Sequence, residues 1–185
     1  NCQQEVGFDS LNYATLLHNI GVLYTYMGNY KDAEKYHIRA LEIRKHILGV
    51  NSVDYATSLN SLGVFYSQIG MYARAEKFLI ESLNIRKSIL GINHPNYARS
   101  LNNLGTYYSE TGDYEKAHKC FLEALAIRRS VTGSNSLDYA TSLNSLGVCY
   151  SQMGNYDYAE KFLIESLNIR KSILGINHPD YAISL

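Results

Sequence analysis

Residues 55–96 read YATSLNSLGVFYSQIGMYARAEKFLIESLNIRKSILGINHPN, and residues 139–180 repeat this string with 36 of 42 positions identical. The same 42-residue step separates five Tyr-Ala dipeptides, with no insertion or deletion between them. A fixed period of this length is typical of tandem repeat proteins, in which each unit packs on its neighbours. The dipeptides begin at Tyr13, Tyr55, Tyr97, Tyr139 and Tyr181.

The period predicts the domain organisation of the chain. Four complete units are expected, over residues 13–54, 55–96, 97–138 and 139–180. Residues 1–12 have the pattern of the tail of a preceding repeat, because Gly7 stands one period before Gly49. Residues 181–185 match the start of a truncated fifth repeat. The sequence therefore predicts an excerpt from a longer array.

Each unit is expected to contain two helices. In the second unit, Leu59, Leu62 and Tyr66 have helical rather than alternating spacing, which predicts a first helix over residues 54–69. Gly70 supplies a stop, and a longer second helix is predicted over residues 73–90, ending at Gly91. The fold class is therefore all-α, built from tandem antiparallel helix pairs. Helix starts are expected at Ser52, His94, Ser136 and His178.

Glycine within the first helix needs a packing reason, because it costs about 0.5–1 kcal/mol relative to alanine. Gly63 is such a residue, and its counterparts recur in all four units. We expect close helix approach there, with Ala75 facing Gly63 in a contact between two small residues.

Leu59, Leu62-Gly63, Tyr66, Ala75, Leu79 and Ser82 resemble the pattern of the tetratricopeptide repeat family. The 42-residue length and strings such as His94-Pro95-Asn96-Tyr97-Ala98 are similar to the longer variant in kinesin light chains and nephrocystin-type proteins. This resemblance implies a right-handed α-solenoid. It also implies that the first helices line a concave groove, which holds a peptide or helical segment of another protein.

The resemblance also indicates which residues face the groove, and nearly all of them are polar and uncharged. The expected binding residues are Asn19, Thr57, Asn60, Val64, Ser67, Gln68, Arg99, Asn102, Asn103, Thr106, Glu110, Thr141, Asn144 and Gln152. By the same register, His18, Ser109, Ser145 and Val148 also point inward.

Asn60, Asn102 and Asn144 occupy one position in three successive units. A carboxamide suits peptide recognition because it can donate to a backbone C=O and accept from a backbone N–H at once. Two interpretations remain open. The asparagines contact a ligand, or they bond to a neighbouring repeat or to water.

The chaperone-binding branch of the family grips a C-terminal carboxylate with Lys, Asn and Arg at inward positions. This sequence departs from that branch, because the expected wall holds no Lys and only one Arg, Arg99. Arg99 and Glu110 are the charged exceptions on a neutral wall, and either could pair with a charged group of the ligand or with the other.

Arg44, Arg86, Arg128 and Arg170 share one position of the second helix, near the middle of its apolar stripe. A covered guanidinium requires partners. We expect a structural role, with a contact to ligand at the groove edge as the alternative. The expected partners are Asp54, Asp138, Asp180 and the tyrosine hydroxyls near the helix starts.

The composition bears on other classes of function. With 17 basic and 17 acidic residues, the chain lacks the basic patch that nucleic-acid binding requires. Cys2, Cys120 and Cys149 are odd in number and differ in repeat position, so neither a disulfide framework nor a metal site is expected. No apolar run approaches a membrane span. We expect a cytoplasmic protein that needs no cofactor.

The sequence therefore predicts a non-enzymatic interaction scaffold. It contains no glycine-rich phosphate loop and no nucleophile motif, so no catalytic residue is assigned. The alternative is a self-assembling module whose exposed ends stack on identical copies into a homo-oligomer or filament.

Overall fold

The computed structural model describes residues 10–175, and within that range every regular element is an α-helix. The predicted all-α fold class is confirmed. The expected segment 181–185 and most of the expected segment 1–12 lie outside the described residues. The helices are α1 (Leu11–Tyr26), α2 (Tyr30–Leu48), α3 (Val53–Gln68), α4 (Tyr72–Leu90), α5 (Pro95–Glu110), α6 (Tyr114–Thr132), α7 (Leu137–Gln152) and α8 (Tyr156–Leu174).

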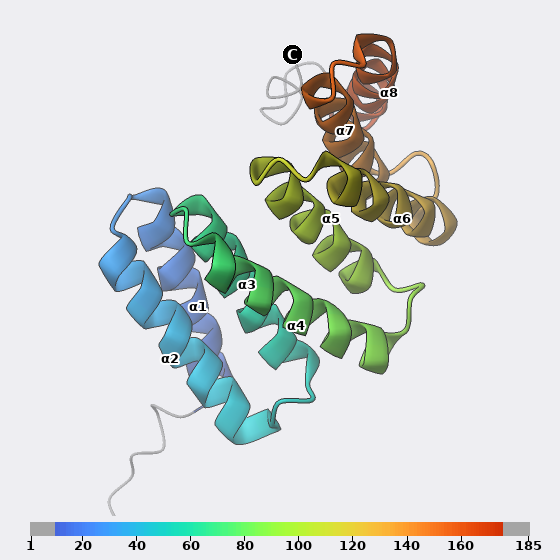
Figure 1. Cartoon of the computed structure of the whole chain (residues 1–185). Helices are drawn as coiled ribbons and strands as arrows, with labels where there is room; N and C mark the ends of the chain where they lie inside the picture. The colour runs from blue at the N-terminus through green and yellow to red at the C-terminus, as the bar shows by residue number, and fades with distance from the viewer. Residues whose placement is uncertain (1–9, 176–185) are drawn as a thin grey trace, which may run out of the picture. The chain divides into compact units, whose positions relative to one another are not determined.

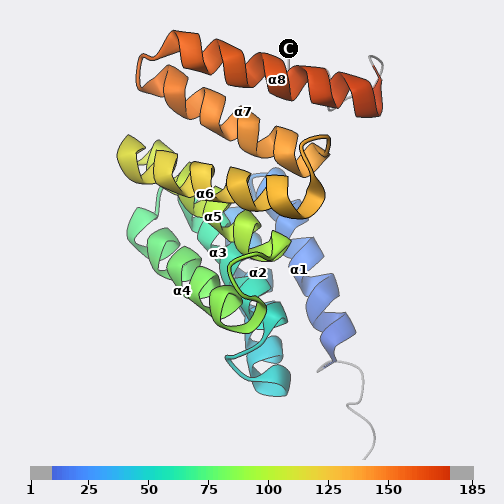
Figure 2. The ribbon, with the colours of Figure 1, turned by 90° about the vertical axis from the view of Figure 1, so that its right-hand side faces the viewer.

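The chain divides into two compact units between Ile89 and Leu90. In the first unit, α1 and α2 form an antiparallel pair and α2 also packs on α3 (Figure 1). In the second unit, α5 pairs with α6 and α7 pairs with α8, while α6 packs on α7 (Figure 2). Helices α5 and α7 also contact each other directly, which places two first helices side by side.

The helix starts follow the predicted caps. Ser52 and Ser136 have extended backbones, and their hydroxyls accept from the backbone N–H groups of Tyr55 and Tyr139. His94 caps α5 in the same way, through a ring nitrogen that accepts from the Asn96 N–H. Such caps satisfy one of the backbone donors that the first turn of a helix leaves unpaired.

The turn after α3 shows why the first helix stops where it does. Gly70 has φ 75°, a left-handed conformation that glycine adopts without a Cβ penalty. The next backbone N–H, that of Met71, then donates to the Tyr66 carbonyl at 2.8 Å and closes the turn. The three-residue connection, residues 69–71, brings α4 back antiparallel to α3.

The glycine inside the first helix is packed differently from the expectation. A Cβ on Gly63 would lie 2.6 Å from Leu79 Cγ, so the close neighbour is Leu79 rather than Ala75. The same relation recurs in the third repeat, where a Cβ on Gly105 would lie 2.7 Å from the Phe121 ring. The second helix therefore presses a large side chain, and not a small one, onto the glycine.

We expect Gly105→Ala to destabilise the protein by about 1–3 kcal/mol, although alanine is the better helix former. The new methyl group would overlap the ring of Phe121, which is 2 % exposed and has little room to move. Urea unfolding followed by circular dichroism measures the change, with the exposed neighbour Thr106→Ala as control. An unchanged or higher midpoint for Gly105→Ala would contradict this packing.

Two of the arginines that share one repeat position, Arg44 and Arg128, bond a second helix to the first helix of the next repeat. Arg44 donates to Ser58 Oγ of α3 at 2.7 Å, and Arg128 donates to Ser142 Oγ of α7 at 2.7 Å. Arg128 also donates to the backbone oxygen of Asp138 at 3.0 Å. Burial lowers the pKa of both guanidinium groups. The predicted structural role is therefore supported.

For Arg44 and Arg128, the hydrogen-bond acceptors differ from the expected carboxylates and tyrosine hydroxyls. Arg44 donates to the hydroxyls of Ser58 and Thr15, and Arg128 donates to that of Ser142. The Thr57 hydroxyl accepts from Arg86 at 3.0 Å. Serine fits because it lies on the face of the first helix that the preceding second helix covers, and both serines are at most 2 % exposed. Asp138 contributes its backbone oxygen. Asp180 lies outside the described residues.

None of the helices described within residues 10–175 combines the length and the hydropathy that a membrane span needs.

Candidate functional site

A groove of about 300 Å³ lies between α5 and α7 in the second unit. Phe121 of α6 lies at its base and is 2 % exposed, whereas Val148 of α7 is 43 % exposed. The remaining lining residues are polar. We call this site the α5–α7 groove, and its lining consists of Thr106, Ser109, Glu110, Phe121, Asn144, Ser145, Val148 and Gln152.

Several polar groups of the groove are already paired within the protein. The Ser109 hydroxyl donates to Gln152 Oε1, which ties the ends of α5 and α7 together. The Thr106 hydroxyl donates to the Asn102 carbonyl, and the Ser145 hydroxyl donates to the carbonyl one turn before it. These hydroxyls keep lone pairs with which they can accept from a ligand.

Asn144 is different, because its carboxamide makes no hydrogen bond to any residue in the described range. The side chain is half-buried and lines the groove. A carboxamide without an internal partner offers both a donor and an acceptor to whatever enters the groove.

Asn102 lies on the same stripe of α5 as Thr106, one turn earlier. Its side chain is 9 % exposed, and its Oδ1 atom is buried with no hydrogen-bond partner in the described structure. A buried carbonyl oxygen left unpaired costs about 1–3 kcal/mol, so this atom would gain from an N–H donor.

The structure brings together four of the residues that the sequence predicts: Thr106, Glu110, Asn144 and Gln152 line one groove. Arg99, Asn102, Asn103 and Thr141 belong to α5 and α7 but lie outside this lining. In the first unit, Asn19 lies on α1, and Thr57, Asn60, Val64, Ser67 and Gln68 lie on α3.

Two groups of expected groove residues are more buried or more internally bonded than their sequence positions indicate. Asn60 and Asn102 are 8 % and 9 % exposed, whereas Asn144 is half-buried. The Thr57 hydroxyl donates to the Val53 carbonyl and accepts from Arg86, which makes it part of the packing between α3 and α4.

Phe121 was absent from the predicted set, because that set was drawn from first helices only. The register of the repeat contains a signal that could have found it. Phe121 follows Gly105 by 16 residues, as Leu79 follows Gly63, and in each case the side chain packs on the glycine. Ser109, Ser145 and Val148 had been assigned to the inward face and do line the groove.

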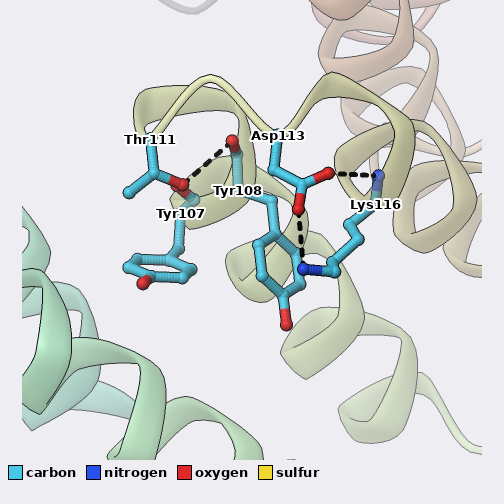
Figure 3. A network of polar contacts seen from close by, with 5 residues as sticks. All are labelled: Tyr107, Tyr108, Thr111, Asp113 and Lys116. Atoms are coloured by element: carbon cyan, nitrogen blue, oxygen red, sulfur yellow. Dashed lines mark hydrogen bonds and ion pairs between the residues drawn. The ribbon is translucent and has the colours of Figure 1, made fainter.

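The turn that closes one end of the groove is rigidly bonded. The Thr111 hydroxyl lies within hydrogen-bonding distance of two backbone carbonyls, that of Tyr107 at 3.1 Å and that of Tyr108 at 3.2 Å (Figure 3). Asp113 accepts from the Lys116 backbone N–H at 3.2 Å and pairs with the Lys116 ammonium at 2.7 Å. These bonds hold the pKa of Asp113 below its usual value. The ammonium also lies 5.1 Å from the centre of the Tyr108 ring.

In the first repeat, the position equivalent to Asn60 holds His18. The His18 ring packs edge-on against the His37 ring, with ring centroids 5.7 Å apart. Both Nδ1 atoms are buried without a partner in the described structure. Burial, with a smaller contribution from the Arg44 charge, lowers the pKa of His18. Burial and the neighbouring His18 lower the pKa of His37 to about 4. Both imidazoles are therefore neutral near pH 7.

The groove lining contains one ionisable side chain, Glu110, and hence no acid–base or nucleophile–base pair. Nowhere in residues 10–175 do three His, Cys, Asp or Glu side chains gather as they would around a metal ion. The chemistry that these groups can supply is hydrogen bonding to amides over a small apolar floor.

The family profile described as tetratricopeptide repeat matches residues 12–88, 60–130, 119–172 and 138–185. No curated protein sequence matches the chain significantly.

Several solved structures share the fold. BtubC (BKLC) from P. vanneervenii is 26% identical, with a TM-score of 0.78 over 95% of this chain and 70% of that one. A putative kinesin light chain of Podosopora anserina, with nearly identical TPR-like repeats, is 20% identical, with a TM-score of 0.77 over 95% of this chain and 83% of that one. A Rap protein complexed with Competence and Sporulation Factor is 15% identical, with a TM-score of 0.77 over 92% of this chain and 46% of that one.

The 42-residue period, the eight helices described in residues 10–175 and the profile matches agree with one another. The chain belongs to the tetratricopeptide repeat family.

Proposed function

We propose that this protein is a non-enzymatic scaffold that holds a peptide or a helical segment of another protein in the α5–α7 groove. The observation that carries the proposal is the Asn144 carboxamide, which lines the groove and has no partner in the described structure. Tetratricopeptide repeats generally serve as non-catalytic scaffolds, and their first helices are where ligands are usually held. Val148 and Phe121 add an apolar surface for a side chain of the ligand.

The groove dimensions favour a narrow ligand. About 300 Å³ accommodates a few side chains rather than the face of a globular protein. Hydrogen-bonding groups on both sides suit a ligand whose own backbone amides are accessible, which an extended segment provides and a helix does not. An extended peptide is therefore the favoured form.

We expect Asn144→Ala to weaken partner binding by about 5- to 100-fold, because the variant removes a donor and an acceptor from the groove. Retention from a cell lysate, followed by titration of the retained protein, measures the change. Asn168→Ala on α8 is the matched control, since Asn168 is exposed and lies outside the groove lining. Equal retention by wild type and Asn144→Ala, at equal thermal stability, would contradict the proposal.

Self-assembly is a second candidate, favoured by the exposed face of α1. Leu16 and Leu23 are 54 % and 57 % exposed, whereas Ser58 and Phe65, the residues 42 positions later, are at most 2 % exposed. Helix α2 covers that later face, so a second copy could cover α1 in the same way.

One detail weighs against such stacking. Ser58 accepts from the arginine of the covering helix, but α1 has Leu16 at that position and offers no acceptor. Arg170 on α8 would then face an apolar side chain, so such a stack would lack the bond that Arg44 makes to Ser58. A molecular mass that rises with concentration in light scattering would favour stacking, and a constant monomer mass would exclude it.

The described cysteines, Cys120 and Cys149, are free thiols, which suits the reducing environment of the cytoplasm. We place the protein there as part of the proposal.

A further inference from the structure

The floor of the α5–α7 groove is made by Phe121, the one aromatic residue of that lining. Its ring lies against the backbone of α5, because a Cβ added to Gly105 would be 2.7, 2.8 and 3.1 Å from three of the ring atoms. Phe121 also belongs to a buried cluster with Ala117, Leu146 and Cys149. A side chain packed on all these sides has little room to move aside for a ligand. The floor therefore gives the groove a fixed depth.

Phenylalanine at this position is particular to the third repeat. The other three repeats hold His37, Leu79 and Leu163 there. Both leucines pack on the glycine of their own repeat through Cγ and Cδ2. A phenylalanine ring ends two bonds beyond the Cδ atoms at which leucine stops. Phe121 therefore fills space at the groove floor that a leucine would leave open.

The room for this ring is matched by a small residue on α7. His37 and Phe65 stand 84 positions before Phe121 and Cys149, and their ring centroids are 5.7 Å apart. Cys149 takes the place of Phe65 at one of the six positions where the fourth repeat differs from the second. The aromatic bulk that the first helix carries at Phe65 is thus carried by the second helix at Phe121, directly under the groove.

The walls above this floor are polar and are bonded to each other. The Ser109 hydroxyl on α5 donates to Gln152 Oε1 on α7, and this bond resists widening of the groove. The Asn144 carboxamide, which makes no hydrogen bond within the described range, can hold the backbone of a ligand. A volume of about 300 Å³ is at the lower end of the range for ligand pockets. The groove is therefore both narrow and shallow.

We propose that Phe121 determines the side-chain specificity of the α5–α7 groove, which accepts an extended peptide with a short apolar side chain, such as alanine or valine, over Phe121 and Val148. Leucine and larger side chains are disfavoured at that position. The inference rests on the proposed function, because it assigns the ligand of the same groove. Contact with Phe121 and Val148 favours an apolar side chain. The fixed depth excludes a long one, because the peptide backbone must stay within hydrogen-bonding reach of Asn144.

The test begins with a phage-displayed library of random nine-residue peptides, selected on the wild-type protein. Peptides that depend on the groove are recognised by loss of binding to Val148→Lys, which places a charged chain across the groove. Val148 is exposed, so this substitution should leave the fold intact. We expect the groove-dependent peptides to share one position that is restricted to short apolar side chains.

Two labelled peptides that differ only in having valine or leucine at this position are then titrated by fluorescence anisotropy. The measured quantity is the ratio of their dissociation constants. Wild type should bind the valine peptide about three- to tenfold more tightly than the leucine peptide. Phe121→Leu gives the third repeat the residue of the second and fourth, and its shorter side chain deepens the floor. This variant should bind the leucine peptide at least as tightly as the valine peptide.

Leu146→Val is the matched control. Leu146 is fully buried in the same cluster as Phe121 but is not part of the groove lining. Like Phe121→Leu, this variant removes volume from the core and should lower stability. It should nevertheless keep the wild-type ratio of the two dissociation constants, because a general loss of packing would weaken both peptides equally.

The outcomes separate the two levels of the proposal. Groove-dependent peptides without a restricted position, or with a large side chain there, would overturn the specificity assignment and leave groove binding standing. Equal ratios in wild type and Phe121→Leu would do the same. Failure to enrich any peptide whose binding is lost in Val148→Lys would count against groove binding itself, and the specificity assignment would fall with it.

Discussion

Arg128→Ala is expected to lower the free energy of unfolding by about 3 kcal/mol. Arg128 is 5 % exposed and donates to the buried Ser142 hydroxyl and to the Asp138 carbonyl, so the variant leaves both acceptors without this donor and also opens a cavity. Because α6 and α7 are joined by these bonds, the loss should appear as weaker coupling between neighbouring helix pairs. Urea unfolding followed by circular dichroism measures the change.

Arg129→Ala provides the matched control. Arg129 is the next residue and is exposed, so its removal changes the net charge equally without breaking the buried bonds. We expect a change within about 0.5 kcal/mol for Arg129→Ala. Ligand affinity should be nearly the same in Arg128→Ala as in wild type at temperatures where both are folded. A large affinity loss at unchanged stability would assign Arg128 to ligand binding instead.

The first unit is expected to lose stability in mild acid because of His18 and His37. The folded-state pKa of His37 is about 4, and an unfolded histidine titrates near 6.5. Between these values the unfolded chain binds more protons than the folded chain, so stability falls as pH decreases from about 6.5 to about 4. The His18 pKa is lowered too and acts in the same direction. The expected loss at pH 4.5, relative to pH 7.5, is roughly 2–3 kcal/mol.

The chain itself supplies the control for this effect. Asn60 and Leu79 stand at the positions 42 residues after His18 and His37. His18→Asn/His37→Leu therefore gives the first helix pair the side chains of the second. Carboxylates titrate in the same range, so the measured quantity is the difference in pH dependence between wild type and this variant. Parallel stability curves from pH 7.5 to 4.5 would contradict the burial of neutral imidazoles.

Much of the fold could be predicted because one unit is copied without length changes. The first helix of the second repeat begins and ends one residue earlier than expected, at Val53 and Gln68. The caps Ser52 and Ser136 and the stop at Gly70 follow from local chemistry, which the sequence displays directly.

Contacts between helices were harder to predict, because they depend on the axial offset between the two packed helices. Gly63 meets Leu79 rather than Ala75, since helix packing sets which turn of α4 lies opposite the glycine. The acceptor for Arg44 is a serine hydroxyl rather than a carboxylate for the same reason. Ser58 lies beneath the covering helix at 2 % exposure.

The candidate site was predictable in location and only partly in detail. The register placed Asn144 and Gln152 on one wall of a groove, where the structure has them. The burial of Asn60 and Asn102 was not apparent, because the asparagine position alone does not show how closely neighbouring helices approach. The base of the groove, Phe121, comes from a second helix and reaches the site only through packing on Gly105.

The central claim is that a protein partner occupies the α5–α7 groove, and site-specific photo-crosslinking tests it most directly. A benzophenone amino acid is introduced in place of Val148, which lines the groove and is 43 % exposed, or in place of Ile164 on α8, which is 48 % exposed and lies outside the lining. Each protein is irradiated in cells that express it, and the adducts are identified by mass spectrometry. We predict a distinct adduct from position 148 that is lost on adding Asn144→Ala and is absent from position 164. Adducts from position 164 alone, or the same adducts from both positions, would contradict binding in the groove.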